Sequence, residues 1–173
     1  MKRLKFYFMF IIIAMVDINF IQAQTEGDKN IEIIKEFYFK NYEIWEITDP
    51  IKFKNELFKL YEKYCTIDLQ TKLKNYYKYG IDEDIIMDNA ITDSTSLKNT
   101  FNINKLTDIE DSYIISFIAY SSQYPDGHDA KPYKVTIIIK MKKENGIYKI
   151  DDIEKNCSLF DLYKNSPYQD DNN

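Results

Sequence analysis

The chain has 173 residues and is acidic, with 23 Lys and Arg against 28 Asp and Glu, for a formal net charge of −5. This charge repels nucleic-acid phosphates and anionic lipid headgroups, so neither is an expected partner. Four glycines and four prolines argue against a repeat protein, a fibre or a long disordered linker.

The first 23 residues have the order typical of a secretory signal peptide. Three basic residues lie within the first five positions, residues 6–16 are apolar, and a small residue, Ala23, ends the segment. Asp17 stops the apolar run after about eleven residues, whereas a membrane span needs roughly twenty. We therefore expect a cleaved export signal, with an uncleaved N-terminal anchor as the alternative.

Export predicts a location in the periplasm or outside a bacterium of the Gram-negative type. The protein would then touch the membrane only through residues 1–23, before cleavage. Because this segment holds three basic residues and one acidic residue, the remaining 150 residues carry a net charge of −7. We expect one domain over residues 24–165, followed by a polar tail at 166–173.

Helical periodicity dominates the first part of the mature chain. A helix is predicted over about 28–47, and Asp49 and Pro50 are typical of the cap and first position of a second one. A third helix is predicted between Thr66, as its cap, and Gly80, as its stop. The apolar stripe of the first helix consists of Ile31, Ile34, Tyr38, Tyr42 and Trp45.

Strand signals follow the helices. Residues 82–90 lack a clear period, and residues 92–100 predict a loop with one helical turn capped by Ser94. A weak strand is predicted from Phe101, and the turn pair Asn145-Gly146 predicts a C-terminal hairpin. The expected strands are 101–106, 113–120, 134–141 and 147–153. This order predicts an α+β fold, with three N-terminal helices packed on one face of a curved antiparallel sheet of about four strands.

The mature chain contains two cysteines, Cys65 and Cys157, separated by 92 positions. In an oxidising compartment an even pair of cysteines is compatible with a disulfide. Two buried free thiols are the alternative, because cysteine packs well as a small apolar residue. Two cysteines and one histidine are too few for a structural zinc site, which needs four ligands.

No known catalytic, nucleotide-binding or metal-binding motif occurs in the sequence, so we assign no catalytic residue, cofactor or metal ligand. An acidic group at Asp82, Glu83, Asp84, Asp88 and Asp93 lacks the spacing of a calcium loop and is read as a solvated loop. The single histidine, His128, follows Pro-Asp-Gly, a turn signature, and is expected to be an exposed loop residue. Tyrosines on the helices suit either a binding surface or a tyrosine-rich core.

Five segments of the chain are similar to a secreted bacterial family, domain of unknown function 3828. They are residues 34–38, 60–66, 69–73, 88–93 and 146–153. The resemblance implies a cone-shaped fold like that of nuclear transport factor 2, with helices covering the concave side of a sheet around a pocket. It implies no catalytic residues. The candidates to line such a pocket are Tyr38, Tyr42, Trp45, Asp88 and His128.

These features favour a non-enzymatic exported binding protein, with an unknown protein or small-molecule ligand in the cell envelope. One version is an immunity-type inhibitor of an envelope toxin, in which an acidic surface would meet a basic partner. The alternative is a small pocket enzyme of isomerase or hydrolase type, in which His128 or a buried acid such as Asp88 would titrate abnormally. A purely structural envelope component is a third reading.

Overall fold

The computed structural model describes residues 29–78, 84–120 and 131–154. The predicted signal, the tail, His128 and Cys157 lie outside these ranges. Residues from 33 onward belong to one compact unit, and residues 1–32 form another, of which only positions 29–32 are described. Within the described residues, four helices and a four-stranded antiparallel sheet confirm the predicted α+β class.

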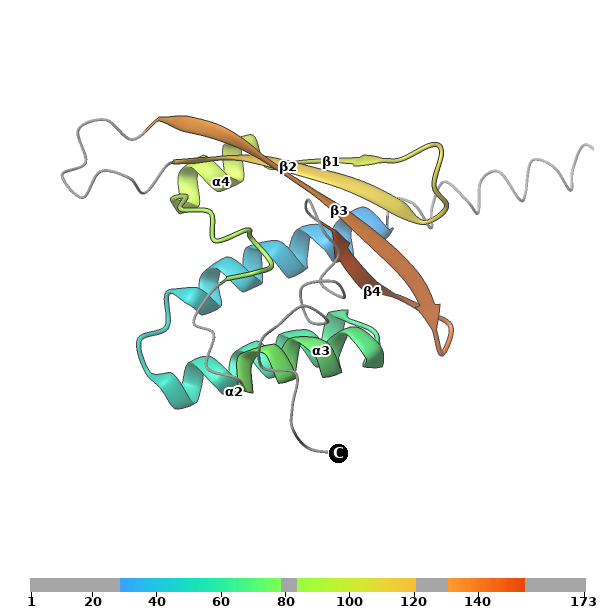
Figure 1. Ribbon diagram of the computed structural model, residues 1–173, viewed down its shortest axis with the longest axis horizontal. Coiled ribbons are helices and arrows are strands. Elements are labelled where there is room, and N and C mark those ends of the chain that lie inside the picture. The colour runs from blue at the N-terminus through green and yellow to red at the C-terminus, as the bar shows by residue number, and fades with distance from the viewer. Residues whose placement is uncertain (1–28, 79–83, 121–130, 155–173) are drawn as a thin grey trace, which may run out of the picture. The chain divides into compact units, whose positions relative to one another are not determined.

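All four described helices precede the strands along the chain (Figure 1). The first helix covers 29–45, α2 is Pro50–Tyr64 and α3 is Ile67–Lys78. Asp49 caps α2 as predicted, because its carboxylate accepts a hydrogen bond of 2.8 Å from the Lys52 amide. Pro50 occupies the first helical position, where its missing amide proton leaves no bond unmade.

The fourth helix, α4, is Ser94–Thr100 and is capped one residue earlier than predicted. Ser94 is not the cap. The Asp93 carboxylate accepts hydrogen bonds from the Thr95 and Ser96 amides, both at 2.9 Å, and from the Ser96 hydroxyl. An ionised carboxylate satisfies more of the free amides at a helix start than a single hydroxyl does, which explains the shift.

The sheet is a meander in which each strand pairs with the next, in the order β1-β2-β3-β4. Its strands are β1 (Asn102–Lys105), β2 (Ser112–Tyr120), β3 (Pro132–Glu144) and β4 (Ile147–Glu154). The β3–β4 hairpin turns at Asn145 and Gly146 as predicted, and both have positive φ, 52° and 82°. Two successive positive φ values define the turn that matches the twist of paired strands.

The core joins the first helix to the sheet through aromatic rings. Tyr38 and Phe39 lie 5.6 Å and 5.2 Å from Phe101, measured between ring centroids. Phe101 in turn stacks on Phe117 of β2, at 6.3 Å. On its other side the helix contacts α2, where Phe37 meets Tyr64 edge to face at 6.0 Å.

Because the first helix packs on two sides, its buried face differs from the predicted apolar stripe. Ile34 and Tyr38 are fully buried as expected, whereas Tyr42 is only half-buried. Phe37 and Asn41 are fully buried instead, and neither belongs to the predicted stripe. A helix that contacts both a sheet and another helix buries a wider face than one periodic stripe describes.

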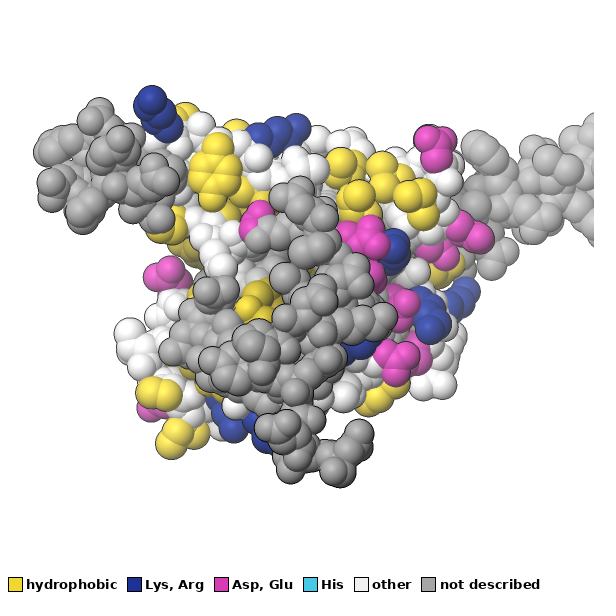
Figure 2. All heavy atoms as spheres, viewed as in Figure 1, with side chains coloured by type: hydrophobic (Ala, Val, Ile, Leu, Met, Phe, Trp, Pro, Cys, Tyr) yellow, Lys and Arg dark blue, Asp and Glu magenta, His cyan; other side chains and the backbone are white. Residues whose placement is uncertain are grey.

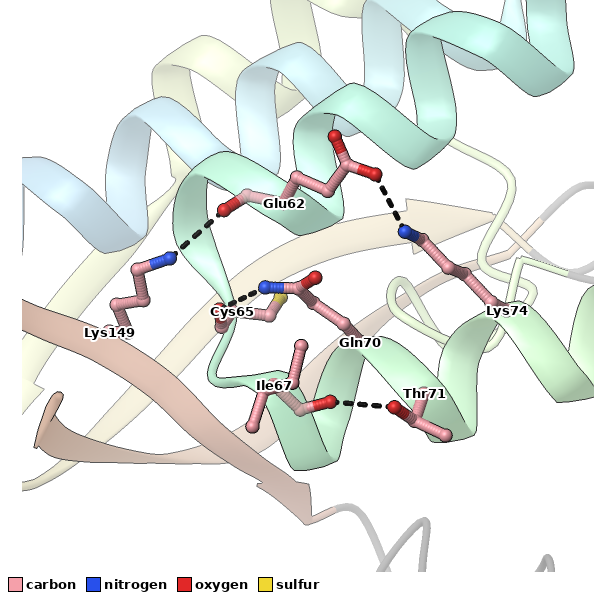
Figure 3. A network of polar contacts seen from close by, with 7 residues as sticks. All are labelled: Glu62, Cys65, Ile67, Gln70, Thr71, Lys74 and Lys149. Atoms are coloured by element: carbon pink, nitrogen blue, oxygen red, sulfur yellow. Dashed lines mark hydrogen bonds and ion pairs between the residues drawn. The ribbon is translucent and has the colours of Figure 1, made fainter.

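The junction of α2 and α3 is tied to β4 by polar contacts (Figure 3). Lys149 of β4 donates a hydrogen bond of 2.9 Å to the Glu62 carbonyl oxygen. Gln70 donates one of 3.0 Å to the carbonyl oxygen of Cys65. The Cys65 thiol itself is free and fully buried, whereas Cys157 lies outside the described residues, so both alternatives for the pair stay predictions. Burial raises the pKa of this thiol, so it stays protonated.

The strands β3 and β4 carry charges of both signs, which Figure 2 shows intermixed over this part of the sheet. Lys140 pairs with Asp152 and Glu154, and Lys142 lies 3.8 Å from Asp151. The pair of Lys142, whose side chain is exposed, contributes little to stability. Among the described helices, none has the length and apolar character needed to cross a membrane.

Candidate functional site

A small pocket lies between the three long helices and the turn that begins at Asp84. The first helix contributes Trp45, its last residue, and the turn contributes Asp84. The centre of a water molecule can move within about 10 Å³ of it, which is room for a single ordered water. The full lining consists of Trp45, Leu57, Tyr61, Leu73, Tyr76, Tyr77, Asp84, Ile85 and Ile86.

Aromatic rings from all three helices build the wall of this pocket. Trp45 packs edge to face against Phe53 of α2, with ring centroids 5.0 Å apart. Phe53 lies 6.0 Å from Tyr77 of α3, and Tyr77 lies 5.6 Å from Phe58. Contacts of this geometry stabilise beyond the area that they bury. They therefore hold the rings that line the pocket in fixed positions.

Asp84 is the only acidic residue of the described lining, and three donors fix its carboxylate. Asn41 donates from Nδ2 to Oδ2 at 2.9 Å. The amides of Ile86 and Met87 donate to Oδ1 at 3.2 Å and 3.1 Å. Since a carboxylate has about four acceptor positions, three bonds leave room for one further donor from the pocket.

Among the described residues, the carboxyl group of Asp84 has no positive neighbour. Among the described residues no Lys or Arg forms an ion pair with it, and none lines the pocket. Although the residue keeps some exposed surface, burial raises the pKa of Asp84 to about 6, against the lowering effect of its hydrogen bonds. A buried acid without a counter-charge shifts in this direction because its charged form is poorly solvated.

Other polar groups of the first helix are buried near Asp84 without a hydrogen-bond partner among the described residues. They are the indole Nε1 of Trp45, the hydroxyl of Tyr38 and Oδ1 of Asn41. The charge of Asp84, together with burial, raises the pKa of Tyr38 and of Tyr61. Buried polar groups are normally satisfied by protein, water or ligand. The partner of the Trp45 indole N–H is therefore not among the described side chains and backbone groups.

The five residues predicted to line a pocket have different positions. Trp45 lines the pocket. Tyr38 is buried close enough to Asp84 that the charge of the carboxylate raises the pKa of its hydroxyl. Tyr42 is not among the lining residues; burial and the charges of Glu46 and Asp93 raise its pKa. Asp88 is not among the lining residues; it lies in the turn with a φ of 67°. His128 lies outside the described residues.

The acidic residues that were predicted to form one solvated loop have different roles. Asp84 lines the pocket and Asp93 caps α4, while Asp82 and Glu83 lie outside the described residues. In the part of the chain that the structure describes, no three His, Cys, Asp or Glu side chains gather as metal ligands would.

The sequence analysis missed Asp84 and Asn41 as site residues. Asn41 is a polar residue between Tyr38 and Trp45 on a buried helix face, and Asp84 directly precedes the apolar run Ile85-Ile86-Met87. A polar residue inside an apolar face is the local signal that could have indicated them. Their pairing joins positions 43 residues apart, which no local pattern encodes.

No family model matches the chain, and no curated protein is similar to it. A solved structure is similar: a protein of unknown function from Bacteroides thetaiotaomicron VPI-5482. It has a TM-score of 0.61 and 19% identity, over 80% of this chain and 98% of that one. At this identity the likeness concerns the fold alone.

Proposed function

We propose that the chain is a non-enzymatic binding domain that holds a small ligand in the pocket at Asp84. The observation that supports this is a prearranged polar group inside an aromatic wall. Asp84 is fixed by three donors with one acceptor position left, and the Trp45 indole N–H has no partner among the described residues. Pockets that bind small molecules combine an apolar lining with a few oriented polar groups in this way.

The single tryptophan of the chain, Trp45, lines the pocket and makes the proposal directly testable. We expect a ligand drawn from a panel of small amines, acids, amides and sugars to change the emission of Trp45 saturably. Filling the pocket with Ile85→Phe should weaken that binding at least about tenfold, because the space holds only about one water. Fluorescence titration of the full chain measures both effects.

The matched control is Ile109→Phe, the same exchange at a residue that is 46% exposed and does not line the pocket. It should bind as the unaltered chain does. If no compound of the panel changes the Trp45 emission, or if both variants weaken binding equally, the pocket is not the binding site.

A pocket enzyme is the second candidate, and the raised pKa of Asp84 favours it. With a pKa of about 6, the carboxyl could accept and return a proton near neutral pH. The bound molecule distinguishes the two functions. A binding domain returns its ligand unchanged after long incubation, whereas an enzyme converts it, with a rate that depends on a group titrating near pH 6 and that Asp84→Asn abolishes. Mass spectrometry of the recovered ligand is the readout.

The wider setting of this function is also a proposal. The signal-like residues 1–23 support export to the periplasm or beyond, and the similar segments support membership of the 3828 family with a cone like that of nuclear transport factor 2. An immunity-type inhibitor remains a version in which the acidic surface binds a basic toxin, and it requires salt-sensitive complex formation with an envelope protein.

A further inference from the structure

The described lining of the pocket carries negative charge only. Its described lining has one carboxylate, Asp84, and no basic side chain, and the other members are aromatic or aliphatic. Asp84 also makes no ion pair among the described residues, although five lysines elsewhere in the described part pair with acids at 3.3 Å or less. A buried carboxylate is stabilised most by a positive group beside it. The described lining supplies no such group, and the pocket has space for one the size of a water molecule.

The aromatic lining adds a second attraction for a positive charge. Trp45, Tyr61, Tyr76 and Tyr77 border the space next to Asp84. The negative faces of aromatic rings attract ammonium groups, and tryptophan does so best. Trp45, Tyr76, Tyr77 and Ile85 of the lining are only half-buried, so the hydrocarbon chain that carries such a group would lie over them, outside the water-sized space.

We propose that the pocket binds a small organic primary ammonium ion, with the Asp84 carboxylate as its counter-charge. This inference rests on the proposed function and names the class of its ligand. An –NH₃⁺ group is about the size of the one water that the pocket can hold, and it donates the further hydrogen bond that Asp84 can accept. A quaternary ammonium group has no N–H and so cannot donate this bond.

The experiment titrates the full chain with n-butylammonium chloride at constant ionic strength and follows the emission of Trp45. We expect saturable binding, and none or at least about tenfold weaker binding of tetramethylammonium and of neutral butyramide. Asp84→Asn should reduce n-butylammonium binding at least about tenfold. The matched control Asp108→Asn, at an exposed residue outside the pocket, should leave it unchanged.

The pH dependence gives a readout on the unaltered chain, so the inference stays testable if Asp84→Asn fails to fold. Since the pKa of Asp84 is about 6, about one carboxyl in ten is ionised at pH 5, and binding should be about tenfold weaker there than at pH 7.5. Among the described residues, the other titratable side chains around Asp84 are Asp88 in the same turn and four tyrosines, and phenols stay neutral in this range. The tyrosines are Tyr38 of the first helix, Tyr61 of α2, and Tyr76 and Tyr77 of α3.

Each contrary outcome has a definite meaning. If butyramide binds as well as n-butylammonium, or if affinity does not change between pH 5 and 7.5, the ammonium inference is wrong while a binding pocket stands. If an anionic or neutral compound of the panel binds and n-butylammonium does not, the inference again fails alone. If nothing changes the Trp45 emission, both the inference and the proposed function fail.

Discussion

Replacing Phe37 by alanine is expected to cost about 3–5 kcal/mol of unfolding free energy. Phe37 is fully buried on the first helix, and its ring contacts Tyr38 at 5.5 Å and Tyr64 at 6.0 Å. Its removal leaves a cavity at the contact of that helix with α2. Because domains are stable by only about 5–15 kcal/mol, this loss should move the urea midpoint strongly or unfold the chain.

The control for this substitution is Ile51→Ala, a helical apolar residue that is 75% exposed. It should change the unfolding free energy by less than about 0.5 kcal/mol. Urea denaturation followed by far-ultraviolet circular dichroism measures both variants. Equal effects of the two substitutions would show that the first helix does not pack as described.

The second large effect is a pH-dependent gain in stability for Asp84→Asn. The pKa of Asp84 is about 6 in the folded chain and about 3.9 in an unfolded one. Between these values the folded state binds more protons, so the stability of the unaltered chain falls as pH rises from about 4 to 6 and stays lower above that range. Asparagine has no proton to lose and removes this fall.

The stability of Asp84→Asn, relative to the unaltered chain, should therefore be about 2 kcal/mol more favourable at pH 7.5 than at pH 4.5. Asparagine can still accept from the Ile86 and Met87 amides, and its amide can donate to Oδ1 of Asn41, which lacks a partner among the described residues. Urea denaturation at the two pH values gives the difference, with Asp108→Asn as the control. A difference that becomes less favourable with rising pH would contradict the assignment.

The elements of the fold were predictable where local signals are strong. Asp49-Pro50 fixes the start of α2, and Asn145-Gly146 fixes the turn of the hairpin, because each pair satisfies a backbone requirement that few residues meet. The cap of α4 was misplaced by one residue because Asp93 and Ser94 are both good caps. Only the geometry, in which Asp93 accepts three hydrogen bonds, separates them.

The candidate site was much less predictable. Trp45 was found because an aromatic residue at helical spacing has a local signature, but Asp84 was read as part of a solvated acidic loop. Its role depends on Asn41, 43 residues away in the sequence, and on aromatic rings from α2 and α3. Such a pocket exists only after the helices pack, so periodicity and turn signals cannot indicate it.

The measurement that tests the central claim most directly is a carbon-13 NMR titration of the Asp84 side-chain carboxyl in the full chain, with and without n-butylammonium. We expect a pKa of about 6 in the free protein, lowered when the cation is bound because the positive charge favours the carboxylate. The account would be contradicted if Asp84 titrates near 4 in the free protein, or if its pKa does not change at saturating n-butylammonium. Either result would mean that Asp84 is not a buried carboxylate that binds a positive ligand.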